Sequence, residues 1–280
     1  MRPAPAVPAL FVAQPGRDSQ RLEPLPFAAS QWGDGRSRLR GMAVSGALAR
    51  AAERTADERT ASTGRPARWT VDLFRPAALQ ACTVRSEVVR RGRRLCVIDV
   101  FLDQDQGTVA RGRGLFLVPP THPPAQEVWT PHDEPSPPPP ELVPASDEPR
   151  LYGSDGVGWT LDAGLHRSAD RKYLWQSAVD VVEGEESTPF QLTAIAADLA
   201  SVVVNWGRGG MAAINADIDI AIAHLPAARE IGLAARDRTE HHGITAGSAL
   251  VFDRAGPIGT ASVVALAGEQ VVDPAARGGT

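Results

Sequence analysis

One acidic residue lies in an apolar stretch of sequence, where its carboxylate is difficult to hydrate. Asp198 falls within "STPFQLTAIAADLASVVVNWG", residues 187–207, and its neighbours on either side are mainly apolar. Thr188 suits a helix N-cap and Pro189 the first helical position, so we predict a buried helix over 189–205. A carboxylate in such surroundings loses water, which raises its pKa towards neutrality and makes it a better general base. The alternative is a buried acid whose charge is satisfied by backbone groups or by a surface arginine.

The other reactive residue types form no recognisable motif. Cys82 and Cys96 lie in separate segments, with no CxxC spacing and no nearby histidine ligands, so we predict no metal site and no cofactor. A formal net charge of -4 gives no reason to expect a nucleic-acid partner, and the arginine run at 90–94 is typical of a solvated hairpin. No stretch approaches the ~18 apolar residues of a membrane span, so we predict no membrane insertion. Together these features favour a cytoplasmic protein.

A proline-rich segment divides the chain. Half of the 24 prolines fall between Pro119 and Pro149, a composition that favours extended polyproline geometry over a packed core. We therefore predict an N-terminal unit over 1–118, a linker over 119–149 and a C-terminal unit over 150–280.

The two units share one pattern. Each contains a helix, at 39–56 and 189–205, followed by several valine- or isoleucine-rich alternating runs with glycines at the turns. The text "FRPAA" at 74–78 aligns with "HLPAA" at 224–228. One helix cannot cover both faces of a five- or six-stranded sheet, so we expect the sheets of the two units to pair, each with a helix against it. The predicted fold class is an α+β pseudo-dimer.

This combination resembles the acyl-CoA thioesterase II-like (TesB-like) double hotdog family. The resemblance rests on the helix, the strand ending in "RPA" or "LPA", the "GRR" hairpin, the closing "G-x-x-A" strand and the proline-rich connector, from about Gln31 to Ala267. It implies two tandem hotdog repeats, each an antiparallel sheet wrapped on a long helix. It also implies an acyl-CoA substrate and further association into a homo-oligomer.

The resemblance also implies a site. Asp198 falls on the position of an aspartate that positions water for attack on a thioester, and Asn215 falls on that of a hydroxyl or amide partner on the next strand. The family's glutamine falls on Val263, or on Val264 with a slip of one residue. The glutamine is therefore missing, and Ser262 is the nearest polar substitute.

Two further positions are candidates for substrate binding. Overlaying the repeats sets Gly41 opposite Asp198, where a glycine lets an acyl chain or the partner helix approach closely. His224 stands where the family commonly has arginine and could touch a CoA phosphate. Plainer roles are a strand or turn cap for Asn215, packing for Ser262 and Gly41, and a solvated strand end for His224.

We predict hydrolysis of acyl-CoA thioesters, with Asp198 and Asn215 holding the water and the N-terminus of the 189–205 helix supporting the oxyanion. Because the glutamine is missing, a non-catalytic acyl-CoA or acyl-chain binding protein is the alternative. A hotdog hydratase or dehydratase is a third possibility, but the "G-D-x-N-P-x-H" type motif is absent from 214–224.

Overall fold

The structure is a computed structural model that describes residues 7–14, 21–30, 32, 37–59, 64–122, 127–128, 135–143 and 149–275. Before the proline-rich segment the elements are β1 (Ala9–Ala13), β2 (Arg21–Pro24), η1 (Pro26–Ala28), α1 (Gly41–Arg59), β3 (Arg65–Leu73), β4 (Cys82–Arg91), β5 (Leu95–Gln104) and β6 (Gly107–Leu117). From η2 (Pro140–Leu142) onward they are β7 (Arg150–Ser154), β8 (Gly158–Thr160), η3 (Ala163–His166), β9 (Lys172–Ser177), β10 (Asp180–Val182), α2 (Pro189–Ala197), α3 (Ala200–Asn205), β11 (Met211–Asn215), β12 (Asp217–Ile222), β13 (Glu230–His241), β14 (Ile244–Asp253) and β15 (Gly256–Val272).

The sheets of the two units form one continuous sheet, as the sequence predicts. Its strand order is β10-β1-β2-β4-β5-β6-β3-β12-β15-β14-β13-β9-β7-β8, with β11 beside β15. The units join where β3 runs antiparallel to β12, pairing Trp69 with Ile220 and Thr70 with Asp219. The α+β double hotdog is thereby confirmed. One detail differs, because β1 and β10 form a parallel pair and the sheet is mixed.

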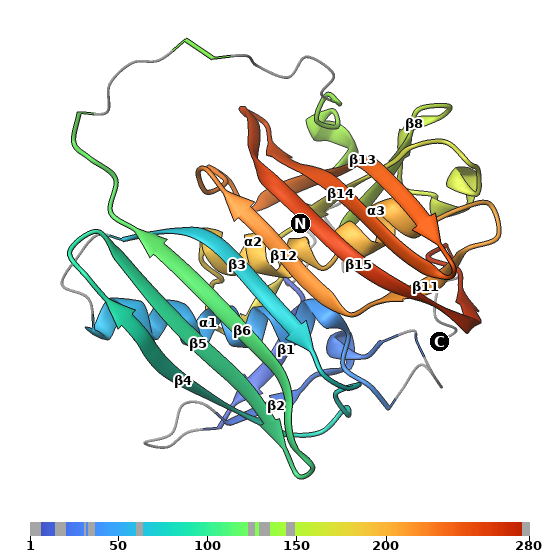
Figure 1. Cartoon of the computed structure of the whole chain (residues 1–280). Coiled ribbons are helices and arrows are strands. Elements are labelled where there is room, and N and C mark those ends of the chain that lie inside the picture. The colour runs from blue at the N-terminus through green and yellow to red at the C-terminus, as the bar shows by residue number, and fades with distance from the viewer. Residues whose placement is uncertain are drawn as a thin grey trace, which may run out of the picture.

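The helices lie together behind the sheet (Figure 1). α1 packs on β4, β5 and β6, and α3 packs on β13, β14 and β15. α1 also packs against α2, so the core of each unit continues into that of the other. The expected turns occur at Gly92, Gly107, Gly243 and Gly256, and the φ of +128° at Gly256 explains the choice of glycine there. No helix in the described part of the chain is long and apolar enough to cross a membrane.

A buried chain of contacts fixes α1 against α2. Trp69 of β3 is fully buried, and its Nε1–H donates to Ser45 Oγ of α1 at 3.0 Å. The Ser45 hydroxyl in turn donates to the Ala194 carbonyl of α2 at 2.7 Å. A β-carbon at Gly46 would lie 2.9 Å from Ile195 Cγ1, so the α1 backbone closely approaches α2. Small residues on α1 therefore serve close packing against the partner helix.

The predicted 189–205 helix begins as expected but is not continuous. Thr188 is the N-cap, with its hydroxyl accepting from the Gln191 N–H, and Pro189 is the first helical residue. α2 ends at Ala197 and α3 begins at Ala200, so the interruption falls on Asp198 and Leu199. The helix is thus interrupted at the acid that the sequence singles out.

We predict that residues 1–118 do not fold alone. β1 would lose its parallel partner β10, and α1 would lose its contact with α2, which exposes apolar surface. The isolated fragment should show no cooperative thermal transition by circular dichroism. Co-expression with residues 119–280 should restore one. A fragment that unfolds cooperatively by itself would contradict this dependence.

Candidate active site

Asp198 lies against the N-terminus of α1. Its Oδ1 accepts a hydrogen bond from Asn215 Nδ2 at 3.1 Å, and its carboxylate also accepts one from the Met42 backbone N–H. A β-carbon added to Gly41 would stand 2.2 Å from Asp198 Oδ1, so nothing separates the carboxylate from the first residue of α1. The structure thus brings Asp198, Asn215 and Gly41 together, from both units of the chain.

The backbone around Asp198 is tighter than an α-helix. The N–H groups of Leu199 and Ser201 donate to carbonyls three residues back, those of Ala196 and Asp198. Such a 3₁₀-like step inside a helix often marks a functional or strained position. Here the step separates α2 from α3 at the residue that meets α1.

α1 begins without a cap of its own. Its first turn contains no acidic residue, and Arg40, which precedes it, is not a capping residue type. The first N–H groups of a helix lack intrahelical partners and carry partial positive charge. Asp198 satisfies one of these groups from the other unit of the chain. The Gly41 N–H donates to no described residue, and it remains available beside the carboxylate.

The environment of Asp198 favours the neutral acid. The residue keeps partial solvent access, yet protein atoms surround its carboxylate closely, and this burial raises its pKa. The hydrogen bonds from Asn215 and Met42, followed by the positive charges of Arg150 and Arg40, act in the opposite direction without cancelling the rise. No described residue forms an ion pair with Asp198, so the carboxylate is not held by a salt bridge.

The orientation of the Asn215 amide follows from its neighbours. Asn215 ends β11, and its Nδ2 donates both to Asp198 Oδ1 and to the Asp217 carbonyl at 3.0 Å. Two acceptors therefore take both amide hydrogens. The Oδ1 of Asn215 accepts no hydrogen bond from the described residues and can serve a ligand as an acceptor.

Three residues of the site are not found from the sequence. Met42 Sδ accepts a hydrogen bond from Arg150 Nη2 at 3.1 Å and is 3.8 Å from Arg40 Nη1. Arg150 lies at the start of β7, directly after the linker, and Arg40 directly before α1. Their sequence contexts give no sign of a shared location, because only the packing of the two units brings them together.

The opposite end of the helix pair holds a second acid. Glu53 of α1 accepts hydrogen bonds from Thr188 Oγ1 at 2.7 Å and Gln191 Nε2 at 2.8 Å, both in the first turn of α2. Burial raises the pKa of Glu53, while these two hydrogen bonds act against the rise. Each helix therefore meets a carboxylate from its partner at its N-terminus.

Two sequence-based expectations about the helices need correction. Counted from the helix starts, the α1 residue equivalent to Asp198 is Arg50, and Gly41 is instead its contact partner. Arg50 is bound by Glu185 at 2.7 Å. The predicted oxyanion support from the 189–205 helix is also misplaced, because Asp198 lies at the far end of α2. The helix start next to Asp198 is that of α1.

Comparison with protein-family models gives two adjacent matches. Residues 28–117 match the acyl-CoA thioesterase N-terminal domain, and residues 120–266 match the acyl-CoA thioesterase C-terminal domain. The chain belongs to the acyl-CoA thioesterase family. No curated protein matches it in sequence.

Solved structures share the fold of this acyl-CoA thioesterase family member. A putative thioesterase from Novosphingobium aromaticivorans superposes with a TM-score of 0.64 at 18% identity, covering 96% of this chain and 100% of that one. A putative thioesterase II from Thermobifida fusca gives 0.63 at 16%, covering 92% and 95%. Acyl-CoA thioesterase II TesB2 from Mycobacterium marinum gives 0.57 at 15%, covering 81% and 90%.

Neither of the two β15 candidates donates a hydrogen bond to Asp198. Ser262 is exposed on the outer face of the sheet, paired with Asp219 and Ser248, so it cannot replace the thioesterase family's glutamine. Val263 points inward and is 3% exposed. The β15 residue directly across from Asn215 is Ala265, which is also buried and apolar.

His224 is also outside the site. It is exposed beyond the end of β12, and its ring nitrogens lie 3.2 Å from the Leu225 carbonyl oxygen and 2.9 Å from that of Pro257. Asn215 precedes the opposite end of β12. The location corresponds to a capped strand end, so His224 takes no part in the group around Asp198, and a contact with a CoA phosphate stays a prediction.

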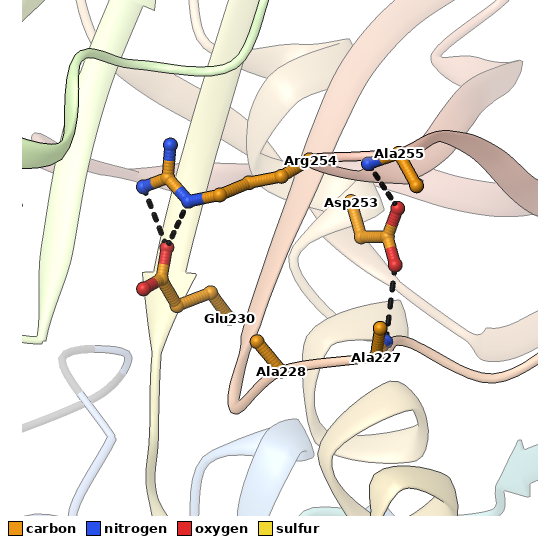
Figure 2. Close-up of a pocket in the computed structure, with 6 residues that line it drawn as sticks. All are labelled: Ala227, Ala228, Glu230, Asp253, Arg254 and Ala255. Atoms are coloured by element: carbon orange, nitrogen blue, oxygen red, sulfur yellow. Dashed lines mark hydrogen bonds and ion pairs between the residues drawn. The ribbon is translucent and has the colours of Figure 1, made fainter.

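A surface cavity of about 240 Å³ lies elsewhere, between the β12–β13 loop and the β14–β15 turn (Figure 2). Its polar groups are already engaged, because Arg254 pairs with Glu230 and Asp253 accepts from the Ala227 and Ala255 N–H groups. The cavity falls below the ~300–1,000 Å³ of typical ligand pockets.

Among the described residues no cluster of histidine, cysteine, aspartate and glutamate could hold a metal.

We predict that Gly41→Ala destabilises this thioesterase family member. Alanine normally favours a helix by up to ~1 kcal/mol, but here its methyl group would displace Asp198. The midpoint of thermal unfolding should fall by several degrees, and Asp198→Gly should restore much of the loss in the double variant. Gly209→Ala, at a glycine with no atom within 4 Å of the added carbon, is the control. Additive effects of the two site substitutions would contradict the contact.

Proposed function

We propose that this protein hydrolyses acyl-CoA thioesters to the free acid and CoA, with Asp198 as general base. The observation that carries the proposal is the meeting of three groups at one point: a partly desolvated carboxylate, an amide with a free oxygen and a helix N-terminus. General-base hydrolysis needs an acceptor for the water proton and a donor for the carbonyl oxygen. The site offers both, and membership of the acyl-CoA thioesterase family supports the substrate class.

The attacking water has two acceptors. One of its protons bonds to the Asp198 carboxylate and the other to Asn215 Oδ1, which leaves an oxygen lone pair for the thioester carbonyl carbon. The free Gly41 N–H and the positive end of α1 stabilise the oxyanion that develops. When the C–S bond breaks, the proton held by Asp198 passes to the departing CoA sulfur.

Asp198→Asn should lower turnover by about 10²–10⁴-fold, because the amide cannot accept the water proton. The measurement is thiol release over acyl-CoA substrates from C2 to C18. Glu53→Gln is the matched control, since it makes the same chemical change at the other helix start and should leave turnover nearly unaltered. Equal turnover by wild type and Asp198→Asn would exclude this base.

The same variant should not lose stability at neutral pH. The folded-state pKa of Asp198 is raised, so this group contributes stability at low pH that is lost as pH rises through the folded pKa. Asparagine removes the ionised form and its desolvation cost. We expect the thermal midpoint of Asp198→Asn to equal or exceed that of wild type at pH 7.5, with the difference shrinking towards pH 4. A drop of several degrees at pH 7.5 would instead identify Asp198 as a structural helix cap.

Catalytic activity should increase with pH, whereas the stability contributed by Asp198 decreases with pH. Catalysis needs the ionised carboxylate, so kcat/KM should fall as pH drops through the raised pKa of Asp198. The acid limb should therefore lie above the ordinary aspartate value of about 4. A pH–rate profile at constant ionic strength measures the position of this acid limb.

Thermal stabilisation by acyl-CoA without thiol release would favour the alternative of a non-catalytic binding protein.

A further inference from the structure

Arg150 has a fixed side chain beside the proposed base. Its Nε donates to Gln176 Oε1 at 2.8 Å, and its Nη2 donates to Met42 Sδ at 3.1 Å. Gln176 is itself fixed, because its amide nitrogen donates to the carbonyls of Pro149 and Ser177. Met42 and Gln176 are both almost fully buried. The guanidinium is therefore held against the residue whose N–H binds Asp198.

The charge of Arg150 is not paired. Its Nη1 donates to no described residue, and no carboxylate in the described part of the chain lies within ion-pair distance of its guanidinium. Several other arginines differ, since each pairs with an acid: Arg50 with Glu185, Arg113 with Asp99, Arg229 with Asp180 and Arg254 with Glu230. Arg150 is also partly accessible to solvent, so a ligand can reach it.

Hydrolysis places a new negative charge in this space. The thioester first becomes an oxyanion and then a carboxylate, which forms next to the Asp198 carboxylate. Two carboxylates in a partly dehydrated site repel each other, and one of them would be forced to take up a proton. A guanidinium keeps its charge throughout, so it can offset this repulsion.

We propose that Arg150 is an anion-binding residue of the active site, which stabilises the thioester oxyanion and then binds the carboxylate of the acid product. The inference rests on the proposed function for its location and extends it to a residue outside Asp198 and Asn215. The reaction remains balanced: water adds to the carbonyl carbon, the C–S bond breaks, CoA leaves as the thiol, and the acid loses its proton to solvent. Arg150 exchanges no proton in this scheme.

The test compares a charged ligand with a neutral one of the same length. Octanoate and octanol are titrated by calorimetry against wild type, Arg150→Gln, Arg150→Lys and the control Arg208→Gln. Arg208 is an exposed arginine that forms no hydrogen bond or ion pair with the described residues. Arg150→Gln should weaken octanoate binding by about 10–100-fold, the range for a hydrogen bond to a charged group, and leave octanol binding unchanged. Arg150→Lys should retain part of the preference for octanoate.

A second readout separates charge from packing. The charged groups that face Asp198 from the described elements are Arg40 before α1 and Arg150 on β7, and both lower its pKa. Because Arg150→Gln removes one of these two cations, the acid limb of kcat/KM should move to higher pH in this variant. Equal losses for octanoate and octanol, or an unchanged octanoate affinity, would overturn the anion site. Wild type that binds octanoate through Arg150 but releases no thiol would instead refute hydrolysis and leave the anion site standing.

Discussion

The close antiparallel packing of α1 against α2 is the constraint on which the site depends. Gly41, Ser45 and Gly46 allow the α1 backbone to approach Asp198, Ala194 and Ile195. A larger residue at either glycine would push the helices apart, and the Met42 N–H would then lose its carboxylate partner. The site is therefore a property of the joined units and belongs to neither unit alone.

The pseudo-symmetry of the two units produces two helix starts with different chemistry. At α2, the Glu53 carboxylate receives hydrogen bonds from both the Thr188 hydroxyl and the Gln191 side chain, which are structural groups of the same helix turn. At α1, no side chain of the first turn plays this role, and Asp198 meets a bare backbone next to glycine. Both carboxylates accept hydrogen bonds from two residues, but Glu53 is bound by side chains of the α2 cap, whereas Asp198 is bound by a backbone N–H and by an amide from β11. The two helix starts therefore differ because α2 has a capping side chain, Thr188, and α1 has none.

Sequence patterns anticipated the architecture because they record local physics. Alternation, turn glycines and the Thr188–Pro189 helix start depend on neighbouring residues, and each appears where expected. The partners of Asp198 were only partly predictable. Asn215 follows from the family resemblance, whereas Met42 reaches the acid from the other unit. Arg150 lies 108 residues from Met42 in sequence and contacts it across the interface between the units. The overlay that set Gly41 equivalent to Asp198 used the wrong register, because the equivalent counted from the helix starts is Arg50, and Gly41 instead faces Asp198 across the antiparallel helix pair.

The apolar inner face of β15 determines which groups can assist the acid. Ala261, Val263 and Ala265 are all buried there, so β15 offers no side-chain hydrogen bond at the position where the family's glutamine was expected. The groups that remain are an amide at the end of β11, a backbone N–H of α1 and a cation that follows the proline-rich segment. Two of these three come from a helix start and from the end of the linker. In the proposed mechanism these groups supply the acceptor for water and the donor for the oxyanion without a polar residue on β15, because the packing of the two units brings them together around Asp198.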